Sequence, residues 1–282
     1  MTGRAIALLV VLAACSPTTQ APPPPTSVDR TTSTPPPEPV ETTVPVGGCV
    51  LGDPPLSEGP GELPISLQEG EPDASHLASW SLTSEEGCER LRISLSTAGG
   101  APARQAGEVK ALILREEGVI RIMLDPAIET TSVVDHRFEG SLVEASFVVR
   151  SQEGLLFVDL HLAAPSAARV FVDRSPAVIT IDLAPGAEPI GSPEVGDQVV
   201  ITQPTGFTQT YPLRVQGYAR SSLVTAQVRS SQTGSELVED ETSSLGDLWG
   251  EYDLVVPTGP VGTVSLVVNG SEGAATKVID IR

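Results

Sequence analysis

Histidines, cysteines and clustered carboxylates are the residues of this 282-residue chain that could do chemistry, and their spacing decides which chemistry is open to them. The three histidines, His76, His136 and His161, lie far apart in no metal-ligand spacing, and the cysteines form no zinc-type pair. The chain has no Gly-x-Ser-x-Gly elbow, no Ser-x-x-Lys nucleophile and no glycine-rich phosphate loop. We therefore predict no catalytic residues, no metal ligands and no cofactor.

Two weaker constellations have simpler explanations. Asp135 and His136 with a distant serine would make a hydrolytic triad, but a serine-rich chain assembles such a set by chance. Glu239-Asp240-Glu241 with Asp247 would supply oxygen ligands for calcium, and the alternative is a solvated loop or edge strand.

Large aromatics and arginines are the remaining candidates for ligand contacts. Trp249 and Tyr252 would stack on a glycan, although a large aromatic in a small β domain usually belongs to the core. Four arginines would meet carboxylates of wall peptides or acidic glycans, and pairing with nearby acidic side chains explains them as well: Arg90, Arg92, Arg115 and Arg121.

The N-terminus carries the most specific signal. One charge at Arg4 precedes an apolar run from Ala5 to Leu12, which is too short to span a bilayer, and Leu12-Ala13-Ala14-Cys15 follows. This segment resembles a bacterial lipoprotein signal, which implies cleavage after residue 14 and a diacylglyceryl thioether on Cys15. The alternative is an ordinary thiol at the end of a plain secretory signal. The resemblance predicts a protein anchored by lipid on the extracytoplasmic face of the cell membrane.

Residues 15–48 are expected to form the lipid anchor and a stalk. Ser16 to Gly48 is rich in Pro and Thr, so we expect it to be disordered and extended, reaching up to about 100 Å at roughly 3.1 Å per residue. If Cys15 carries lipid, Cys49 and Cys88 remain as an even pair in an oxidising compartment, which favours a disulfide over two free thiols.

The net charge of the chain limits the classes of partner that it could bind. The net charge of −19 makes nucleic acid an unfavourable partner, because a nucleic-acid interface needs a basic surface. An acidic excess suits a wall-associated surface protein.

Past the stalk the pattern predicts an all-β protein with two sandwich-like domains. Alternating apolar runs predict strands at residues 91–95, 109–114, 119–124, 145–149, 155–162, 168–172 and 178–183. In the fifth run Leu156, Val158, Leu160 and Leu162 share one face, which predicts a half-buried strand with Asp159 and His161 on the other face. Asp173 to Pro176 fits a hairpin turn.

A second set of runs follows a Pro and Gly rich joint from Pro185 to Gly196. Seven short strands are expected, at residues 199–202, 213–218, 223–229, 236–241, 251–256, 263–268 and 277–281. This number and spacing favour an antiparallel immunoglobulin-like sandwich and a domain boundary near residue 190.

The second segment resembles a known module. Five runs carry the resemblance: Ile201-Thr202-Gln203-Pro204, Pro212 to Ala219, Gly250 to Leu254, Val264 to Val268 and the closing Val278 to Ile281. These runs are similar to the Gmad2 domain, the immunoglobulin-like module of spore germination and related envelope proteins. The resemblance covers residues 197–282 and implies a binding or scaffolding role without catalytic residues.

Residues 85–185, within an expected first domain of residues 49–187, resemble the AMIN-like β domains of actinobacterial secreted and lipid-anchored proteins. The similarity lies in Glu89-Arg90-Leu91-Arg92-Ile93, the run from Ile120 to Ala127, Arg169-Val170-Phe171 with Pro176, and the run from Ile179 to Leu183. Such domains are associated with peptidoglycan and envelope targeting. We therefore predict a non-catalytic envelope lipoprotein that binds cell-wall polymer or docks another envelope protein, the alternative being an accessory subunit or hydrolase of wall remodelling.

Overall fold

The computed structural model describes residues 54–65, 70–85 and 87–282, and these form an all-β protein. Apart from one 3-10 turn, η1 (Arg115–Glu117), the described residues lie in strands and the loops between them. The all-β prediction is therefore confirmed. The signal segment, Cys15, the stalk and Cys49 lie outside the described residues.

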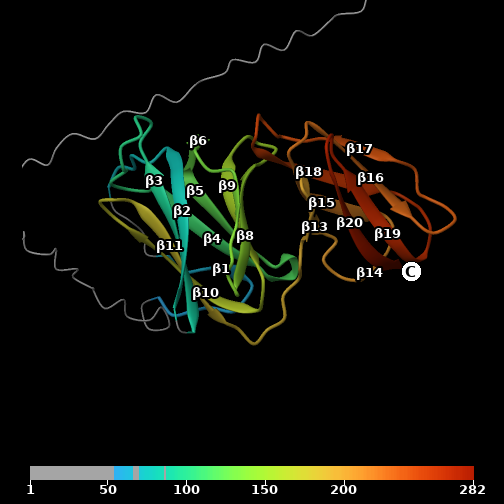
Figure 1. Ribbon diagram of the computed structural model, residues 1–282, viewed down its shortest axis with the longest axis horizontal. Helices are drawn as coiled ribbons and strands as arrows, with labels where there is room; N and C mark the ends of the chain where they lie inside the picture. Colours follow the sequence, from blue (N-terminus) through green and yellow to red (C-terminus); the bar gives the residue numbers. More distant parts are fainter. Residues whose placement is uncertain (1–53, 66–69, 86) are drawn as a thin grey trace, which may run out of the picture. The chain divides into compact units, whose positions relative to one another are not determined.

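A five-stranded sheet forms one layer of residues 54–187, which we call the first region (Figure 1). Its strands are antiparallel except at the short β6, which runs parallel to β2. In spatial order they are β10 (Ser166–Asp173), β11 (Val178–Pro185), β3 (Cys88–Ser96), β2 (His76–Glu85) and β6 (Thr130–Thr131).

A ten-stranded sheet faces this layer and continues into residues 197–282, which we call the second region. Its continuity depends on a short parallel pairing of β8 with β18, in which Val149 lies opposite Trp249 and Arg150 opposite Gly250. The order is β1 (Gly61–Glu62), β4 (Glu108–Leu114), β5 (Val119–Ile128), β9 (Leu156–Leu162), β8 (Val143–Arg150), β18 (Trp249–Val256), β15 (Leu213–Ala219), β13 (Val199–Gln203) and β12 (Glu194–Val195), with β7 (Asp135–Arg137) paired to β8.

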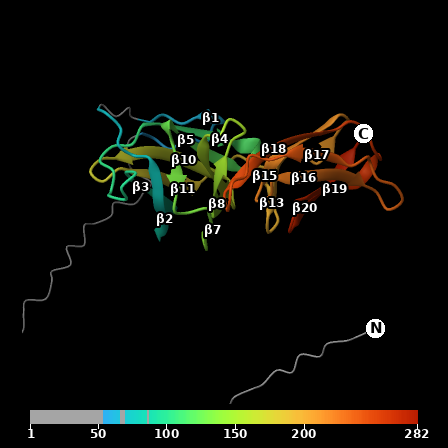
Figure 2. The ribbon, with the colours of Figure 1, turned by 90° about the horizontal axis from the view of Figure 1, so that it is seen from above.

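A third sheet completes the second region (Figure 2). Its strands are β14 (Thr208–Gln209), β20 (Ala274–Ile281), β19 (Gly262–Asn269), β16 (Leu223–Arg229) and β17 (Val238–Glu241), in that order. All pairs are antiparallel except β14 with β20.

Each region has its own apolar core between two sheets. In the first region, residues such as Leu91 and Ile181 of the five-stranded sheet meet Ile122 and Leu160 of the long sheet. In the second region, Val215 and Leu254 meet Val224, Leu266 and Ile279. Alternating apolar positions on each strand supply these contacts, which is why the period-2 pattern of the sequence located the strands.

The strand predictions are confirmed at nearly every run, and so is the hairpin between β10 and β11, where Asp173 pairs with Val178. The longest strand that the sequence did not predict is β2. A register shift between Leu77 and Ser79 interrupts its alternation, so its apolar residues Leu77, Trp80 and Leu82 do not keep one period. The division into two domains is not tested by this arrangement and stays a prediction.

The prediction that β9 is a half-buried strand is wrong. β9 was expected to be half-buried, yet all seven of its residues are buried, including Asp159 and His161 at 0% exposure. The reason is that the second face of β9 is covered by side chains of the second region, which form a separate apolar cluster with it.

Candidate functional site

The junction between the two regions is packed by the faces of β8 and β9 that point away from the first core. Phe147 is central: its ring centroid lies 4.6 Å from His161, 5.4 Å from Tyr218 and 5.1 Å from Trp249. Val149, Phe157 and Val200 join the same cluster. Because β8, β9, β13, β15 and β18 all contribute, this cluster holds the polar groups beside it in fixed positions.

Arg121 is the charged centre of the junction. It lies on β5 directly opposite Asp159 of β9, whose carboxylate accepts hydrogen bonds of 2.8 Å from both Nε and Nη2. Nη1 lies 3.5 Å from Glu251 Oε1 on β18 of the second region. The guanidinium carbon lies 4.0 Å from the centroid of the Phe157 ring, a cation–π contact.

The neighbouring carboxylates keep the Arg121 guanidinium protonated. Burial alone would lower the pKa of Arg121, but the charge and hydrogen bonds of Asp159, aided by Glu251, outweigh it and raise that pKa. The guanidinium therefore stays charged. Burial raises the pKa of Glu251, and the charge of Arg121 offsets part of this effect.

His161 and Tyr218 form a second polar contact across the junction. The histidine Nε2 is hydrogen-bonded to the tyrosine hydroxyl, and both side chains are buried. Burial lowers the pKa of His161 to about 3, and burial together with the charge of Asp159 raises the pKa of Tyr218. Both groups are therefore neutral at ordinary pH.

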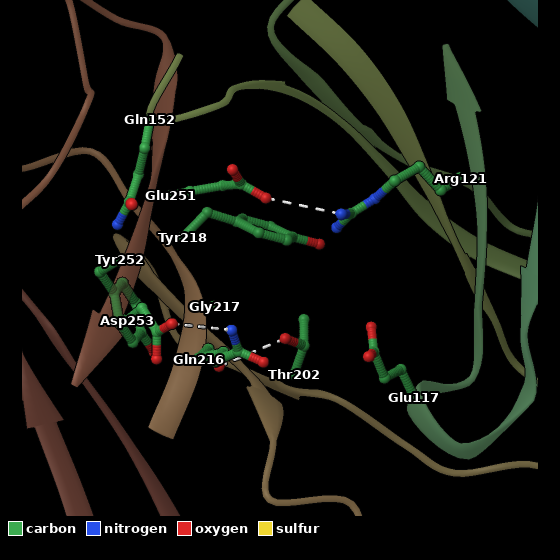
Figure 3. Close-up of a pocket in the computed structure, with 10 residues that line it drawn as sticks. All are labelled: Glu117, Arg121, Gln152, Thr202, Gln216, Gly217, Tyr218, Glu251, Tyr252 and Asp253. Carbon is green, nitrogen blue, oxygen red and sulfur yellow. Dashed lines mark hydrogen bonds and ion pairs between the residues drawn. The ribbon is translucent and has the colours of Figure 1, made fainter. Parts of the chain in front are cut away.

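A polar cavity of about 140 Å³ opens beside these groups (Figure 3). Arg121 and Glu117 line it from the first region, opposite Gln216, Glu251 and Asp253 of the second. Gln152 of the β8–β9 loop, Thr202, Gly217, Tyr218 and Tyr252 complete the lining. The cavity thus exists because two separate regions each supply a wall.

Several lining groups are already held by neighbours. Asp253 accepts hydrogen bonds from Arg214, whose guanidinium lowers the pKa of that carboxyl group. Gln216 Nε2 donates to the same carboxylate at 3.2 Å, and Glu117 Oε1 accepts a hydrogen bond of 2.8 Å from Gln203 Nε2. These contacts fix the orientation of the lining side chains.

A second, more apolar cavity of about 380 Å³ adjoins the first. It shares Arg121, Gln152 and Glu251 with the polar cavity. Its remaining lining is largely aliphatic or aromatic and consists of Met123, Leu124, Ser151, Glu153, Leu155, Leu156 and Phe157. The shared residues make the two cavities neighbouring parts of one surface.

Asp135 and His136 are not arranged as two members of a triad. Asp135 Oδ2 accepts hydrogen bonds from Arg220 Nη2 at 2.6 Å and from Trp249 Nε1 at 2.9 Å. The ring of His136 packs instead edge-on against Phe138. Asp135 therefore serves the junction by binding two residues of the second region.

The other predicted candidates have structural partners. Trp249 and Tyr252 are buried, as the core alternative predicted, and Glu239-Asp240-Glu241 lies on the edge strand β17. The four arginines all lie near carboxylates: Arg90 with Asp182 at 2.6 Å, Arg92 with Asp173 at 3.8 Å, Arg115 with Glu188 at 3.8 Å and Arg121 as described. Of these, only Arg121 lines either junction cavity.

Cys88 is disulfide-bonded and buried at the start of β3. Because Cys49 and Cys15 lie outside the described residues, the Cys49–Cys88 pairing and the lipidation of Cys15 stay predictions. Among the described residues no group of three or more His, Cys, Asp or Glu side chains is arranged to hold a metal ion.

The sequence did not reveal Glu117, Asp159, Tyr218 or Glu251 as site residues. The available signal was the pair Asp159 and His161 inside an otherwise apolar strand, since buried polar groups require partners. That signal indicates a contact without naming its partner.

Fold and cavity together define an all-β protein with a polar cavity between two packed regions. Comparisons with known protein families, with curated proteins and with solved structures found no match. In the part of the chain that the structure describes, no helix has the length and apolar character needed to cross a bilayer.

Proposed function

We propose that this protein is a non-catalytic cell-envelope lipoprotein that binds a cell-wall polymer, peptidoglycan or an associated glycan. The observation that carries the proposal is the junction cavity, whose lining residues carry carboxylates, amides, hydroxyls and a guanidinium that suit a polar ligand. Binding sites for small polar groups combine such convergent side chains with a preformed concave surface.

The topology of the second region favours the immunoglobulin-like, Gmad2-like interpretation. β13, β15 and β18 share one sheet, while β17, β16, β19 and β20 are neighbours in the other. This division of seven strands between two sheets is typical of immunoglobulin-like sandwiches, which commonly serve as binding modules on cell surfaces. The AMIN-like interpretation of the first region adds an expected role in wall targeting.

The proposed location is the extracytoplasmic face of the membrane, with Cys15 carrying the lipid and residues 16–48 acting as a stalk. The disulfide-bonded state of Cys88 supports this location, because disulfides persist in oxidising compartments. The acidic charge of −19 is compatible with a wall-facing protein and unfavourable for nucleic acid.

The direct test is co-sedimentation of the fragment Pro45–Arg282 with purified insoluble cell wall. This fragment is one of the two units into which the chain divides, and it contains every strand that the structure describes. We expect retention that saturates with wall concentration. Absence of retention by the folded fragment would contradict the proposal and favour docking to an envelope protein, sought by crosslinking in intact cells.

The alternative of a wall hydrolase draws on one observation: Glu117 and Glu251 face the same cavity, and glycoside hydrolysis uses two carboxyl groups. It predicts release of soluble fragments from purified peptidoglycan, with Glu251→Gln abolishing release. Binding without release, at full folding, would exclude this alternative.

A further inference from the structure

We propose that the two junction cavities together form a site for an aliphatic ammonium group, such as the free amino side chain of a wall peptide. This inference deepens the proposed function, because it names the chemical group of the polymer that the site recognises. The polar cavity takes the ammonium, and the adjoining apolar cavity takes the methylene chain.

Charge balance in the polar cavity favours a cation. Its charged lining consists of three carboxylates, those of Glu117, Glu251 and Asp253, and one guanidinium, that of Arg121. Arg121 uses both nitrogens of its fork on Asp159, which lies behind the lining, and approaches Glu251 only at 3.5 Å. One cation thus serves two carboxylates, and the cavity keeps negative charge that an ammonium would neutralise.

The state of each carboxylate points to the same conclusion. Asp253 already has Arg214 as its cation, whereas the contact described for Glu117 is the neutral amide of Gln203. Glu251 lies partly buried between Arg121 and the Gln152 loop. Glu117 and Glu251, one from each region, are therefore the two carboxylates that we assign to the ammonium.

The uncharged lining suits the same ligand. An ammonium group has three N–H donors and no acceptor, so it needs oxygen acceptors from several directions. Gln152, Thr202 and Gln216, whose side chains each carry an oxygen acceptor, line the cavity together with the carboxylates.

The adjoining cavity explains why the cation would be attached to an aliphatic chain. Met123, Leu124, Leu155 and Leu156 line it, and it meets the polar cavity at Arg121, Gln152 and Glu251. The Phe157 ring in its lining lies against the Arg121 guanidinium, at 4.0 Å. A chain of methylene groups gains from burial against the leucine and methionine side chains while its charged end reaches the carboxylates.

The test compares two forms of the same peptidoglycan, freed of associated glycans: one with its amino groups intact and one acetylated with acetic anhydride. Acetylation removes the positive charge and keeps the polymer. We expect the fragment Pro45–Arg282 to bind the acetylated form at least about tenfold more weakly, equivalent to about 1.4 kcal/mol. Equal binding to both forms would overturn the ammonium site while leaving wall binding intact.

Variants of the two assigned carboxylates test whether the ammonium binds in the polar cavity. Glu251→Gln and Glu117→Gln should each weaken binding to the intact form several-fold and reduce the difference between the two forms. Glu239→Gln on the edge strand β17 makes the same charge change at an exposed position that lines neither cavity, and it should bind as the wild type does. Unaltered binding by both cavity variants would overturn the assignment, provided that circular dichroism shows that they are folded.

A small probe separates this inference from the proposed function. Pentane-1,5-diamine should bind the fragment and compete with peptidoglycan, and Glu251→Gln should weaken its binding. Diamine binding without any peptidoglycan binding would retain the ammonium site and overturn the wall-binding function. If peptidoglycan freed of associated glycans still binds, the ammonium comes from the peptide rather than from a glycan substituent.

Discussion

Asp159, fully buried on β9, accepts hydrogen bonds of 2.8 Å from both Nε and Nη2 of Arg121, its direct partner on β5. The sheet itself therefore sets the separation of the two charges. The third nitrogen of Arg121 faces Glu251 of the second region at 3.5 Å. One guanidinium thus contacts a carboxylate from each region, and its single positive charge links the stability of the junction to the charge of the cavity.

Replacing Arg121 by methionine should destabilise the protein strongly. Asp159 would remain buried without its cation, and breaking a buried ion pair from one side costs about 3 to 5 kcal/mol. Urea unfolding of Arg121→Met measures this loss, and the double variant Arg121→Met with Asp159→Leu should recover a large part of it. The exposed pair Arg214 and Asp253 gives the control, since Arg214→Ala should change stability little. A small loss in Arg121→Met would contradict the buried pairing.

The buried His161 should make stability depend on pH. Its folded pKa is about 3 and its ordinary value 6.5, so between these values the unfolded chain binds a proton that the folded protein does not. The free energy of unfolding therefore falls as the pH decreases below 6.5, and this histidine contributes a loss of about 2 kcal/mol at pH 5.

The measurement is urea unfolding at pH 7 and pH 5 for the wild type and for His161→Gln, which keeps a hydrogen-bonding group toward Tyr218. The variant should lose less stability between the two pH values than the wild type does. His136→Gln, at an exposed ring, should behave as the wild type. Equal pH dependence in His161→Gln and the wild type would show that His161 is not buried in its neutral form.

The strands could be predicted from the sequence, because each places alternate side chains in a core and so leaves a local pattern. The junction could not, because its contacts join residues far apart: His161 and Tyr218 are 57 positions apart, and Arg121 and Glu251 are 130 apart. Periodicity shows that β9 has a second face carrying Asp159 and His161. It does not show that Tyr218 and Trp249 cover that face.

Trp249 should couple the unfolding of the two regions. Its ring packs on Phe147 and Tyr218, and its Nε1 donates to Asp135 of the first region at 2.9 Å. Trp249→Ala should cost about 3 to 5 kcal/mol. Hydrogen exchange should then show β3 and β19 losing protection in separate steps, whereas in the wild type they lose it together. A single step in the variant would mean that the junction does not depend on this side chain.

Cys15 should carry the lipid that the N-terminal signal predicts. Cells given a labelled fatty acid should incorporate the label into the wild-type protein and not into Cys15→Ser. Cys49→Ser gives a matched cysteine control that should keep the label. Label that follows Cys15→Ser as strongly as the wild type, or that is absent from both, would contradict the lipoprotein prediction.

Gly217 tests how closely the cavity wall is packed. A Cβ at this position would lie 1.9 Å from the Val200 carbonyl oxygen and 2.6 Å from the Tyr252 hydroxyl oxygen. The carbonyl belongs to β13, next to β15 in the long sheet, so it cannot move without disturbing that pairing. Gly217→Ala should therefore lower the free energy of unfolding by about 3 kcal/mol, the upper end for an overpacked site.

Gly59→Ala is the control, because a Cβ there meets nothing within 4 Å, and it should leave urea unfolding nearly unchanged. If Gly217→Ala unfolds at the same urea concentration as Gly59→Ala, β13 and β15 are not packed as closely at the cavity as described.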